Sequence, residues 1–144
     1  MGTAATTHVH TGRTAAQWAA LIFGIVFIAV ALLGFVSGGM TMESDPARAP
    51  HLIGMFPVNL LHNVVHLAFG IAGLVFARTF SGARGYLIVS GVIYLLLSIY
   101  GLIIDHDTAA NFVPIDSADN WLHLVLAAGM LVLGFVLGRR PANA

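Results

Sequence analysis

The sequence predicts an all-α protein, an integral membrane four-helix bundle made of two parallel helical-hairpin repeats with both termini in the cytoplasm. Composition is the first indication. Of the 144 residues, 58% are hydrophobic and 8% are charged, whereas about a quarter are charged in an ordinary soluble domain. A chain this apolar cannot cover its surface with polar groups, so we expect lipid to be its main solvent. The distribution of charges and an internal repeat are the other two indications.

Missing residue types exclude several classes of function. The absence of cysteine excludes disulfide frameworks, thiolate metal sites and cysteine nucleophiles. The absence of lysine excludes Schiff-base chemistry and the phosphate-binding P-loop. A lipid-embedded chain is also not expected to bind nucleic acid or to act as a cytosolic enzyme.

Four apolar stretches are long enough to cross a hydrocarbon core of about 30 Å as helices. They cover residues 18–36, 58–77, 86–104 and 121–137. The first stretch has about twenty residues, whereas the apolar core of a signal peptide has roughly 7 to 15. We therefore expect the first stretch to be a retained helix.

The predicted transmembrane domain covers residues 17–140, with a cytoplasmic tail before it (1–16) and a short tail after it (141–144). Both tails are small and polar, and we expect them to be disordered. His8 and His10 lie in the first tail. Two ligands on a tail make a poor metal site, so we assign them no function.

The charged residues separate by side of the predicted membrane. Five of the six arginines lie before, between or after the spans on one side: Arg13, Arg78, Arg84, Arg139 and Arg140. All six acids lie in the two connections on the other side: Glu43, Asp45, Asp105, Asp107, Asp116 and Asp119. Since basic residues stay on the cytoplasmic side, both termini are predicted inside and the two longer loops outside. Arg48 is the one exception.

The second half of the chain repeats the first. A shift of 57 residues aligns the second span with the fourth, so that Pro57, Asn59, His62, Asn63 and His66 match Pro114, Asp116, Asp119, Asn120 and His123. The first and third spans match more weakly, through the glycine pairs Gly24 with Gly34 and Gly91 with Gly101. We predict two repeats, residues 17–80 and 84–140. Because both begin on the same side, they are parallel repeats about an axis along the membrane normal.

The start of the second and fourth spans carries helix-start signals. Pro57 and Pro114 suit the beginning of a helix, where a missing N–H is harmless. Asn59 and Asp116 follow two residues later, and their side chains can accept hydrogen bonds from the free N–H groups of the first turn. We predict a capping role for these two residues.

A polar stripe follows on each of these spans. Helical spacing places Asn59, His62, Asn63 and His66 on one face of the second span. His66 lies roughly 13 Å below Pro57, which is inside the outer half of the membrane. A polar side chain is costly in lipid at that depth, so we expect both stripes to point into the bundle and towards each other.

Interpretations of the two stripes remain open. In the favoured one, asparagines and histidines form an interhelical hydrogen-bond cluster, each bond contributing about 0.6 to 2 kcal/mol, that holds the hairpins together. In the second, His66 and His123 ligate a haem b or a metal ion. The residues expected around such a group are His62, Asn63, Asn120 and Asp119. A closed zinc site prefers four ligands, so haem fits better. In the third interpretation, the stripes have a proton- or quinone-related role.

The outer loops carry a weaker signal. Their thioether and imidazole groups are Met40, Met42, His51, Met55 and His106. Thioethers with imidazole suit copper(I), but scattered loop residues favour anchoring at the interface over a metal site.

The segments at residues 57–67 and 118–124, which carry the two histidine motifs, resemble a family of small four-span bacterial membrane proteins known as domain of unknown function 4383. The resemblance covers residues 17–140. It implies a multi-pass protein of the bacterial cytoplasmic membrane with no assigned activity, so no catalytic residue is carried over and a non-enzymatic role is favoured. The expected partners are the lipid bilayer and a second copy or another membrane protein.

Overall fold

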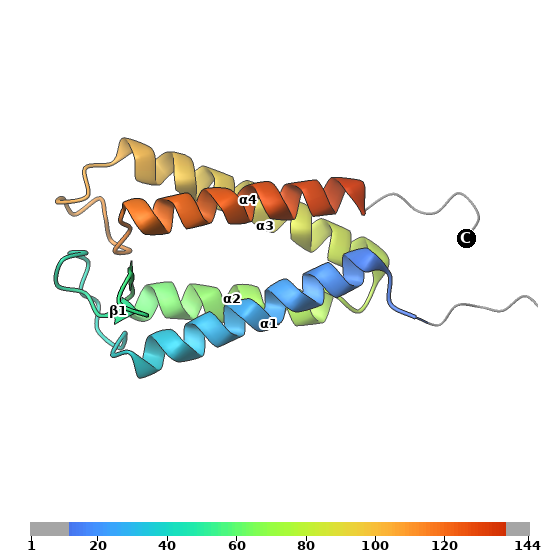
Figure 1. Cartoon of the computed structure of the whole chain (residues 1–144), viewed down its shortest axis with the longest axis horizontal. Coiled ribbons are helices and arrows are strands. Elements are labelled where there is room, and N and C mark those ends of the chain that lie inside the picture. The colour runs from blue at the N-terminus through green and yellow to red at the C-terminus, as the bar shows by residue number, and fades with distance from the viewer. Residues whose placement is uncertain (1–11, 138–144) are drawn as a thin grey trace, which may run out of the picture.

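The protein is all-α apart from one small β-hairpin, in a computed structural model that describes residues 12–137. Its four helices are α1 (Ala15–Val36), α2 (Leu60–Phe76), α3 (Phe80–Ile103) and α4 (Ser117–Val136). Helices α1 and α2 form hairpin A, α3 and α4 form hairpin B, and the two hairpins lie side by side (Figure 1). Helix α1 starts and α4 ends at the same end of the bundle, while the two long loops lie at the other (Figure 1).

Three of the helices are long and apolar enough to cross a membrane. They are α1 with 22 residues, α3 with 24 and α4 with 20. Helix α2 is apolar but shorter, at 17 residues. The predicted stretches 18–36, 86–104 and 121–137 therefore each fall on a helix of membrane-spanning length.

Helices α3 and α4 begin six and four residues before the apolar stretches predicted for them. Helix α3 begins at Phe80 because Thr79 accepts a hydrogen bond from the backbone N–H of Gly82. Helix α4 begins at Ser117, four residues before its apolar run. In both cases a polar first turn precedes the apolar residues, so hydropathy alone misses it. Arg84, predicted in the link between spans, lies within α3, and that link is only residues 77–79.

The predicted caps of α2 and α4 are confirmed. Asn59 accepts a hydrogen bond from the N–H of His62 at 2.9 Å, and Asp116 accepts one from the N–H of Asp119 at 2.8 Å. Pro57 lies two residues before the first of these caps and so outside the helix, which begins at Leu60 and not at residue 58 as predicted.

The first loop contains a β-hairpin that the sequence did not predict. Strand β1 (His51–Leu52) pairs antiparallel with β2 (Phe56–Pro57). Its turn includes Ile53 and Gly54, with φ of 49° and 74°. A left-handed backbone is rare for a β-branched residue, and strands of two residues are too short for any alternating pattern to reveal them.

Glycines allow the backbones of hairpin A to touch. A Cβ atom on Gly24 would lie 2.9 Å from the carbonyl oxygen of Gly70 and 2.9 Å from the amide nitrogen of Leu74. In hairpin B, a Cβ on Gly91 would instead meet the side chain of Leu131 at 2.8 Å. At these two glycines, hairpin A is therefore packed backbone against backbone, whereas in hairpin B the nearest atoms belong to the Leu131 side chain and its backbone nitrogen follows at 3.1 Å.

The two hairpins bury the same positions. In α1 the buried residues are Ala16, Ala20, Gly24, Phe27, Ala31 and Gly34. Residues 67 positions later in α3 are also buried, namely Ala83, Leu87, Gly91, Tyr94, Ser98 and Gly101. In α2 they are His62, Asn63, His66, Gly70 and Gly73. Residues 57 positions later in α4 are buried as well, namely Asp119, Asn120, His123, Ala127 and Met130.

Aromatic rings join the hairpins at mid-height. Phe27 of hairpin A stacks on Tyr94 of hairpin B, with ring centroids 5.4 Å apart and planes 16° apart. Phe69 packs beside both rings, with centroids 6.2 Å from Phe27 and 5.4 Å from Tyr94. These rings are part of the main hydrophobic core.

Polar contacts secure the end of the bundle where α1 starts. The side-chain amide of Gln17 donates to the carbonyl oxygens of Ala77 and Arg78, each at 3.1 Å. This ties the first turn of α1 to the short link between α2 and α3. Helix α1 itself begins at Ala15, two residues inside the predicted tail 1–16. His8, His10, Arg139 and Arg140 lie outside the described residues.

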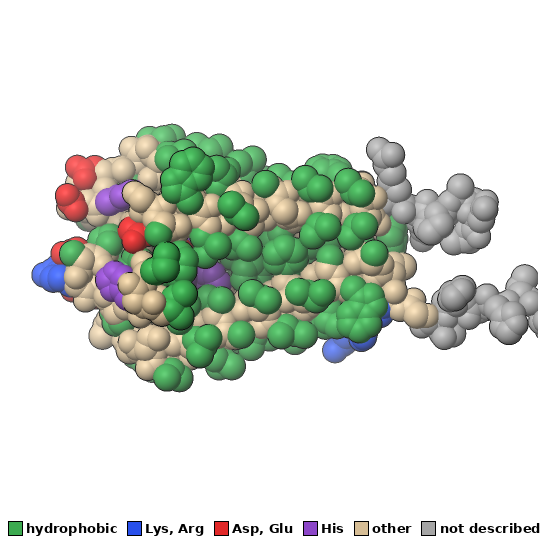
Figure 2. Space-filling view, viewed as in Figure 1, with side chains coloured by type: hydrophobic (Ala, Val, Ile, Leu, Met, Phe, Trp, Pro, Cys, Tyr) green, Lys and Arg blue, Asp and Glu red, His purple; other side chains and the backbone are tan. Residues whose placement is uncertain are grey.

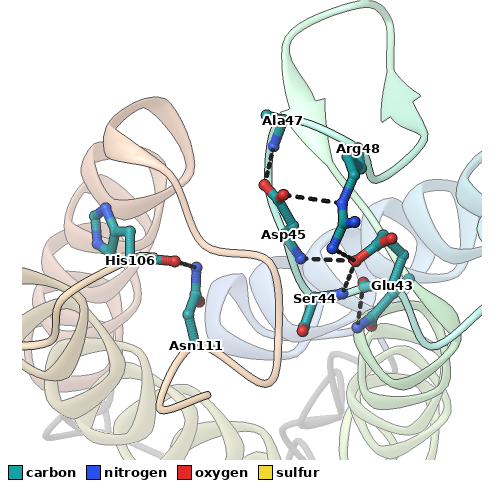
Figure 3. A network of polar contacts seen from close by, with 8 residues as sticks. Glu43, Ser44, Asp45, Ala47, Arg48, His106 and Asn111 are labelled. Atoms are coloured by element: carbon teal, nitrogen blue, oxygen red, sulfur yellow. Dashed lines mark hydrogen bonds and ion pairs between the residues drawn. The ribbon is translucent and has the colours of Figure 1, made fainter. Parts of the chain in front are cut away.

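The opposite end carries the charges of the two long loops. Acidic side chains gather there, while hydrophobic side chains cover the flanks of the helices (Figure 2). Arg48, the exception to the predicted charge separation, pairs with Glu43 at 3.4 Å and Asp45 at 2.9 Å (Figure 3). In the other loop, Asn111 donates to the carbonyl oxygen of His106 at 3.2 Å (Figure 3).

Substituting Gly24 with alanine should destabilise hairpin A. The new methyl group would meet backbone atoms of α2, which cannot move aside without displacing the helix, and overpacking costs about 1–3 kcal/mol. The midpoint of thermal unfolding in detergent micelles should fall. Gly129→Ala is the matched control, because a Cβ there meets nothing within 4 Å. Equal midpoints for the two variants would contradict the proposed contact.

Candidate functional site

All six residues predicted for a site are buried. They are His62, Asn63, His66, Asp119, Asn120 and His123, with exposed fractions from 0% to 7%. They lie in the first two turns of α2 and α4, at the end of the bundle that carries the long loops. The caps described above set where these turns begin and therefore the depth of the polar side chains.

Four rings form a cluster where the hairpins meet. The His62 and His66 rings stack, with centroids 4.4 Å apart and planes 10° apart. Across the hairpins, the His62 and His123 centroids are 6.5 Å apart. Tyr94 packs 5.2 Å from His123 and 6.5 Å from His66. We call His62, His66, Tyr94 and His123 the ring cluster.

One hydrogen bond orients the His66 ring. Its Nδ1 lies 3.1 Å from the carbonyl oxygen of His62, one helical turn earlier. A carbonyl oxygen only accepts, so Nδ1 carries the proton. In the neutral ring this leaves Nε2 as a hydrogen-bond acceptor.

Asp119 and His123 are adjacent without forming a hydrogen bond. The Asp119 carboxylate oxygen Oδ1 lies 3.8 Å from Nε2 of His123, one turn later on α4, which is beyond hydrogen-bonding distance. Their side chains are only 3% and 5% exposed. An acid and an imidazole are thus enclosed side by side.

Several buried polar atoms at this end lack hydrogen-bond partners among residues 12–137. They are His62 Nδ1, Asn63 Oδ1, Asp119 Oδ2, Asn120 Oδ1 and His123 Nδ1. Native structures leave few such atoms unpaired, and each costs about 1–3 kcal/mol. Three of the five belong to the His and Asp side chains in or beside the ring cluster, so hydrogen-bonding capacity is left unused there.

The two asparagines face helices of their own hairpins. Asn63 donates to the carbonyl oxygen of Gly39 at 2.9 Å, and its amide fills the space where Gly34 of α1 has no side chain. Asn120 packs against Gly101 of α3 in the same way, since a Cβ there would lie 2.5 Å from its oxygen. Both asparagines therefore pack within a hairpin and not into the ring cluster.

Asn59 connects the two loops. Besides capping α2, its Nδ2 donates to the carbonyl oxygen of Glu43 at 3.2 Å and to that of Phe112 at 3.3 Å. Glu43 lies in the loop of hairpin A and Phe112 in the loop of hairpin B. The side chain is 0% exposed, so one buried amide joins the hairpins at this end.

A cavity of about 620 Å³ adjoins the ring cluster, within the roughly 300–1,000 Å³ range of small-molecule sites. All four rings line it, together with apolar residues: Leu61, Val65, Ile93, Leu96, Leu97, Tyr100, Phe112, Val113 and Ile115. Among residues 12–137, no arginine lines it. Tyr94 was not predicted as a site residue, because it lies within an apolar run. The one feature of the sequence that could have pointed to Tyr94 is its alignment with Phe27, 67 residues earlier, when the first and third helices are compared as repeats.

The structure does not assemble a multi-ligand metal site in the part of the chain that it describes. Among these residues, no group of three or more His, Asp or Glu is placed to hold a metal ion. The predicted pair His66 and His123 supplies two nitrogen ligands at most. In the loop of hairpin B, Nε2 of His106 lies 2.8 Å from the carbonyl oxygen of Gly101 and is already hydrogen-bonded.

The family model for Domain of unknown function (DUF4383) matches residues 17–136. The chain belongs to this family. The match includes both histidine motifs and nearly all of the four helices, which confirms the resemblance seen in the sequence. No curated protein and no solved structure matches the chain. The description of the DUF4383 family assigns no activity, so function has to be inferred from the site.

Replacing Asn59 with aspartate should separate its two roles. Aspartate still caps α2, but it cannot donate to Glu43 and Phe112, and its charge repels their carbonyl oxygens. At about 1 kcal/mol per hydrogen bond, the loss should be about 2 kcal/mol, seen as a lower unfolding midpoint in micelles. The reciprocal variant Asp116→Asn keeps the cap of α4 and should change little. If both variants unfold alike, the amide of Asn59 does not join the loops.

Proposed function

We propose that this member of the DUF4383 family is a four-span protein of the bacterial cytoplasmic membrane whose ring cluster is a binding site for a small ligand. The observation that carries the proposal is the ring cluster itself, whose four polar rings line an otherwise apolar cavity and two of which, His62 and His123, hold a buried nitrogen without a hydrogen-bond partner among the described residues. We keep residues 17–140 as the proposed transmembrane domain between two tails, although α1 itself begins two residues earlier, at Ala15.

Helix length and charge support four spans with both termini inside. At 1.5 Å per residue, the 17 residues of α2 rise about 25 Å, and spans of 17–25 residues are known. Arg13 and Arg78 lie at the end of the bundle where α1 starts. Acids occupy the loops at the other end (Figure 2), which the positive-inside rule assigns to the outside.

The matching burial of the hairpins supports the proposed parallel repeat. A duplicated hairpin should bury equivalent positions, because its helices pack through the same faces. The offsets of 67 residues between α1 and α3 and of 57 between α2 and α4 are both constant. They differ because the loop of hairpin A is ten residues longer.

Reporter fusions test this topology. A cytoplasm-active reporter fused after Arg140 should be active, because the arginines hold that end inside. An export-dependent reporter inserted at Gly54, in the exposed turn between β1 and β2, should also be active. As a control, the two reporters are exchanged. The export-dependent reporter fused after Arg140 and the cytoplasm-active reporter inserted at Gly54 should both be inactive. Activity in the exchanged pair would overturn the topology.

Hydrogen bonds divide the polar residues into two groups. The side-chain bonds of Asn63 and His66 stay within hairpin A, and Asn59 joins the loops. We therefore assign the asparagines to holding loops and helices together, as predicted for the whole stripe. The histidines instead keep ring nitrogens available, and we assign them to binding.

Haem is the second candidate ligand, supported by the orientation of His66. Histidines that ligate metals usually donate their other ring N–H to a carbonyl or carboxylate, and His66 donates in this way to His62. The propionates of haem, however, would find no arginine or lysine in the cavity wall. The absorption spectrum of the purified protein distinguishes the candidates, since a Soret band that disappears in His66→Leu would establish haem.

Removing unpaired nitrogens should not weaken the ligand-free protein. His62→Leu and His123→Leu each delete a buried nitrogen without a partner, and replacing unpaired polar groups by apolar ones can be neutral or stabilising. Their unfolding midpoints in ligand-free micelles should equal or exceed that of the parent protein. His51→Leu, at the exposed residue of strand β1, is the control for the effect of added hydrophobicity. A clear fall in both midpoints would show that the histidines hold the hairpins together instead.

A further inference from the structure

We propose that the ligand is a prenylated quinone or quinol, with its ring in the cavity beside the ring cluster and its tail along the groove between α2 and α3. This inference rests on the proposed binding function and adds the chemical class of the ligand. Three properties of the groove point to that class: a neutral polar wall, a long apolar extension and an apolar rim.

The wall around the ring cluster suits a neutral, flat headgroup. It contains aromatic and imidazole rings against which a planar ring can stack. It contains no arginine and the chain has no lysine, so an anionic headgroup such as a phosphate would lie there without a countercharge. A quinone ring is flat, uncharged and polar at its two opposite oxygens.

The cluster offers both acceptors and donors. With its proton on Nδ1, His66 presents Nε2 as an acceptor for a quinol hydroxyl. The Tyr94 hydroxyl can donate to a quinone oxygen, as can a protonated ring nitrogen of His62, since both side chains line the cavity. The same three side chains can therefore recognise the oxidised and the reduced form of one ring.

A second cavity provides room for a tail. It has a volume of about 440 Å³ and is lined by α2 and α3, including Ala68, Ala72 and Phe76. Ile93 lines both cavities, so the two are neighbours on either side of its side chain. From His62 to Phe76 the groove follows α2 for about 20 Å. A compact polar ligand would leave this apolar length unused, whereas a prenyl chain would fill it.

The rim of the first cavity is apolar and exposed. Its outer residues are Val65, Ile93, Leu96 and Phe112, with exposed fractions of 36%, 36%, 60% and 56%. In a membrane, side chains on these flanks of α2 and α3 face the acyl chains. A ligand dissolved in the bilayer can therefore enter sideways without crossing water.

Native mass spectrometry of the full chain in micelles tests the assignment. The probes are a benzoquinone and a naphthoquinone, each with a short prenyl tail, and phosphatidylglycerol as the lipid arm. We expect one quinone to bind one to one and to raise the unfolding midpoint, and phosphatidylglycerol to do neither. Equal protection by phosphatidylglycerol would overturn the quinone assignment.

Two neighbouring residues of α2 provide a matched pair for the groove. Val65 lines the cavity and Val64 does not, although both are exposed to a similar degree, at 36% and 47%. Val65→Trp should fill the mouth and abolish quinone binding, whereas Val64→Trp should bind like the parent. Equal binding by both variants would overturn the location.

Single-group variants test recognition by the rings. Tyr94→Phe removes only a hydroxyl, and His66→Leu removes the acceptor. Each should weaken quinone binding about tenfold or more, which corresponds to the loss of one good hydrogen bond. His51→Leu should leave it unchanged. Unaltered affinity in both cluster variants would mean that the headgroup lies elsewhere.

Other outcomes separate this inference from the proposed function. If neither quinone binds, but the protein retains a different small molecule that Val65→Trp displaces, the quinone assignment is wrong and the binding site stands. A Soret band lost in His66→Leu would likewise replace quinone by haem. If no small molecule is retained or displaced, and the histidine variants change only the unfolding midpoint, both the inference and the proposed function are wrong.

Discussion

Close contact between the two helices of each hairpin determines where the other groups of the bundle lie. In hairpin A, Gly24 touches the backbone of α2 at Gly70 and Leu74, so that face of α1 can carry only small residues. The large rings must then project from the remaining faces, where the hairpins meet. Phe27 and Tyr94 stack there, and their thickness sets the separation of the hairpins near the histidines.

The separation of the hairpins explains why some polar side chains of α2 and α4 have hydrogen-bond partners and others do not. Within a hairpin, Asn63 reaches a carbonyl oxygen because α1 and its loop are near. Between hairpins the aromatic rings act as spacers, and the histidine nitrogens find no partner across the gap. The same packing thus gives the Asn63 amide nitrogen a partner within its hairpin and leaves imidazoles with unused hydrogen-bonding capacity beside a cavity.

Local patterns in the sequence predicted most of the fold, whereas contacts between segments far apart in the sequence could not be predicted from them. The caps at Asn59 and Asp116 and the buried stripe follow from helical spacing and hydrogen bonding over three residues. The small β-hairpin at residues 51–57 has no periodicity to detect. Tyr94 belongs to the site because the packing of the hairpins places its ring beside His66 and His123, and no local pattern in its apolar surroundings indicates that packing.

The buried amide of Asn59 bears on how molecules exchange with the interior. It fastens the loops of both hairpins at one end, and the short link held by Gln17 closes the other. A crevice fastened at both ends opens only through its sides. In a bilayer, its contents would equilibrate with the lipid phase and not with the aqueous phase. Occupancy would then depend on how strongly a molecule partitions into the membrane, so that even a modest intrinsic affinity could keep such a crevice filled.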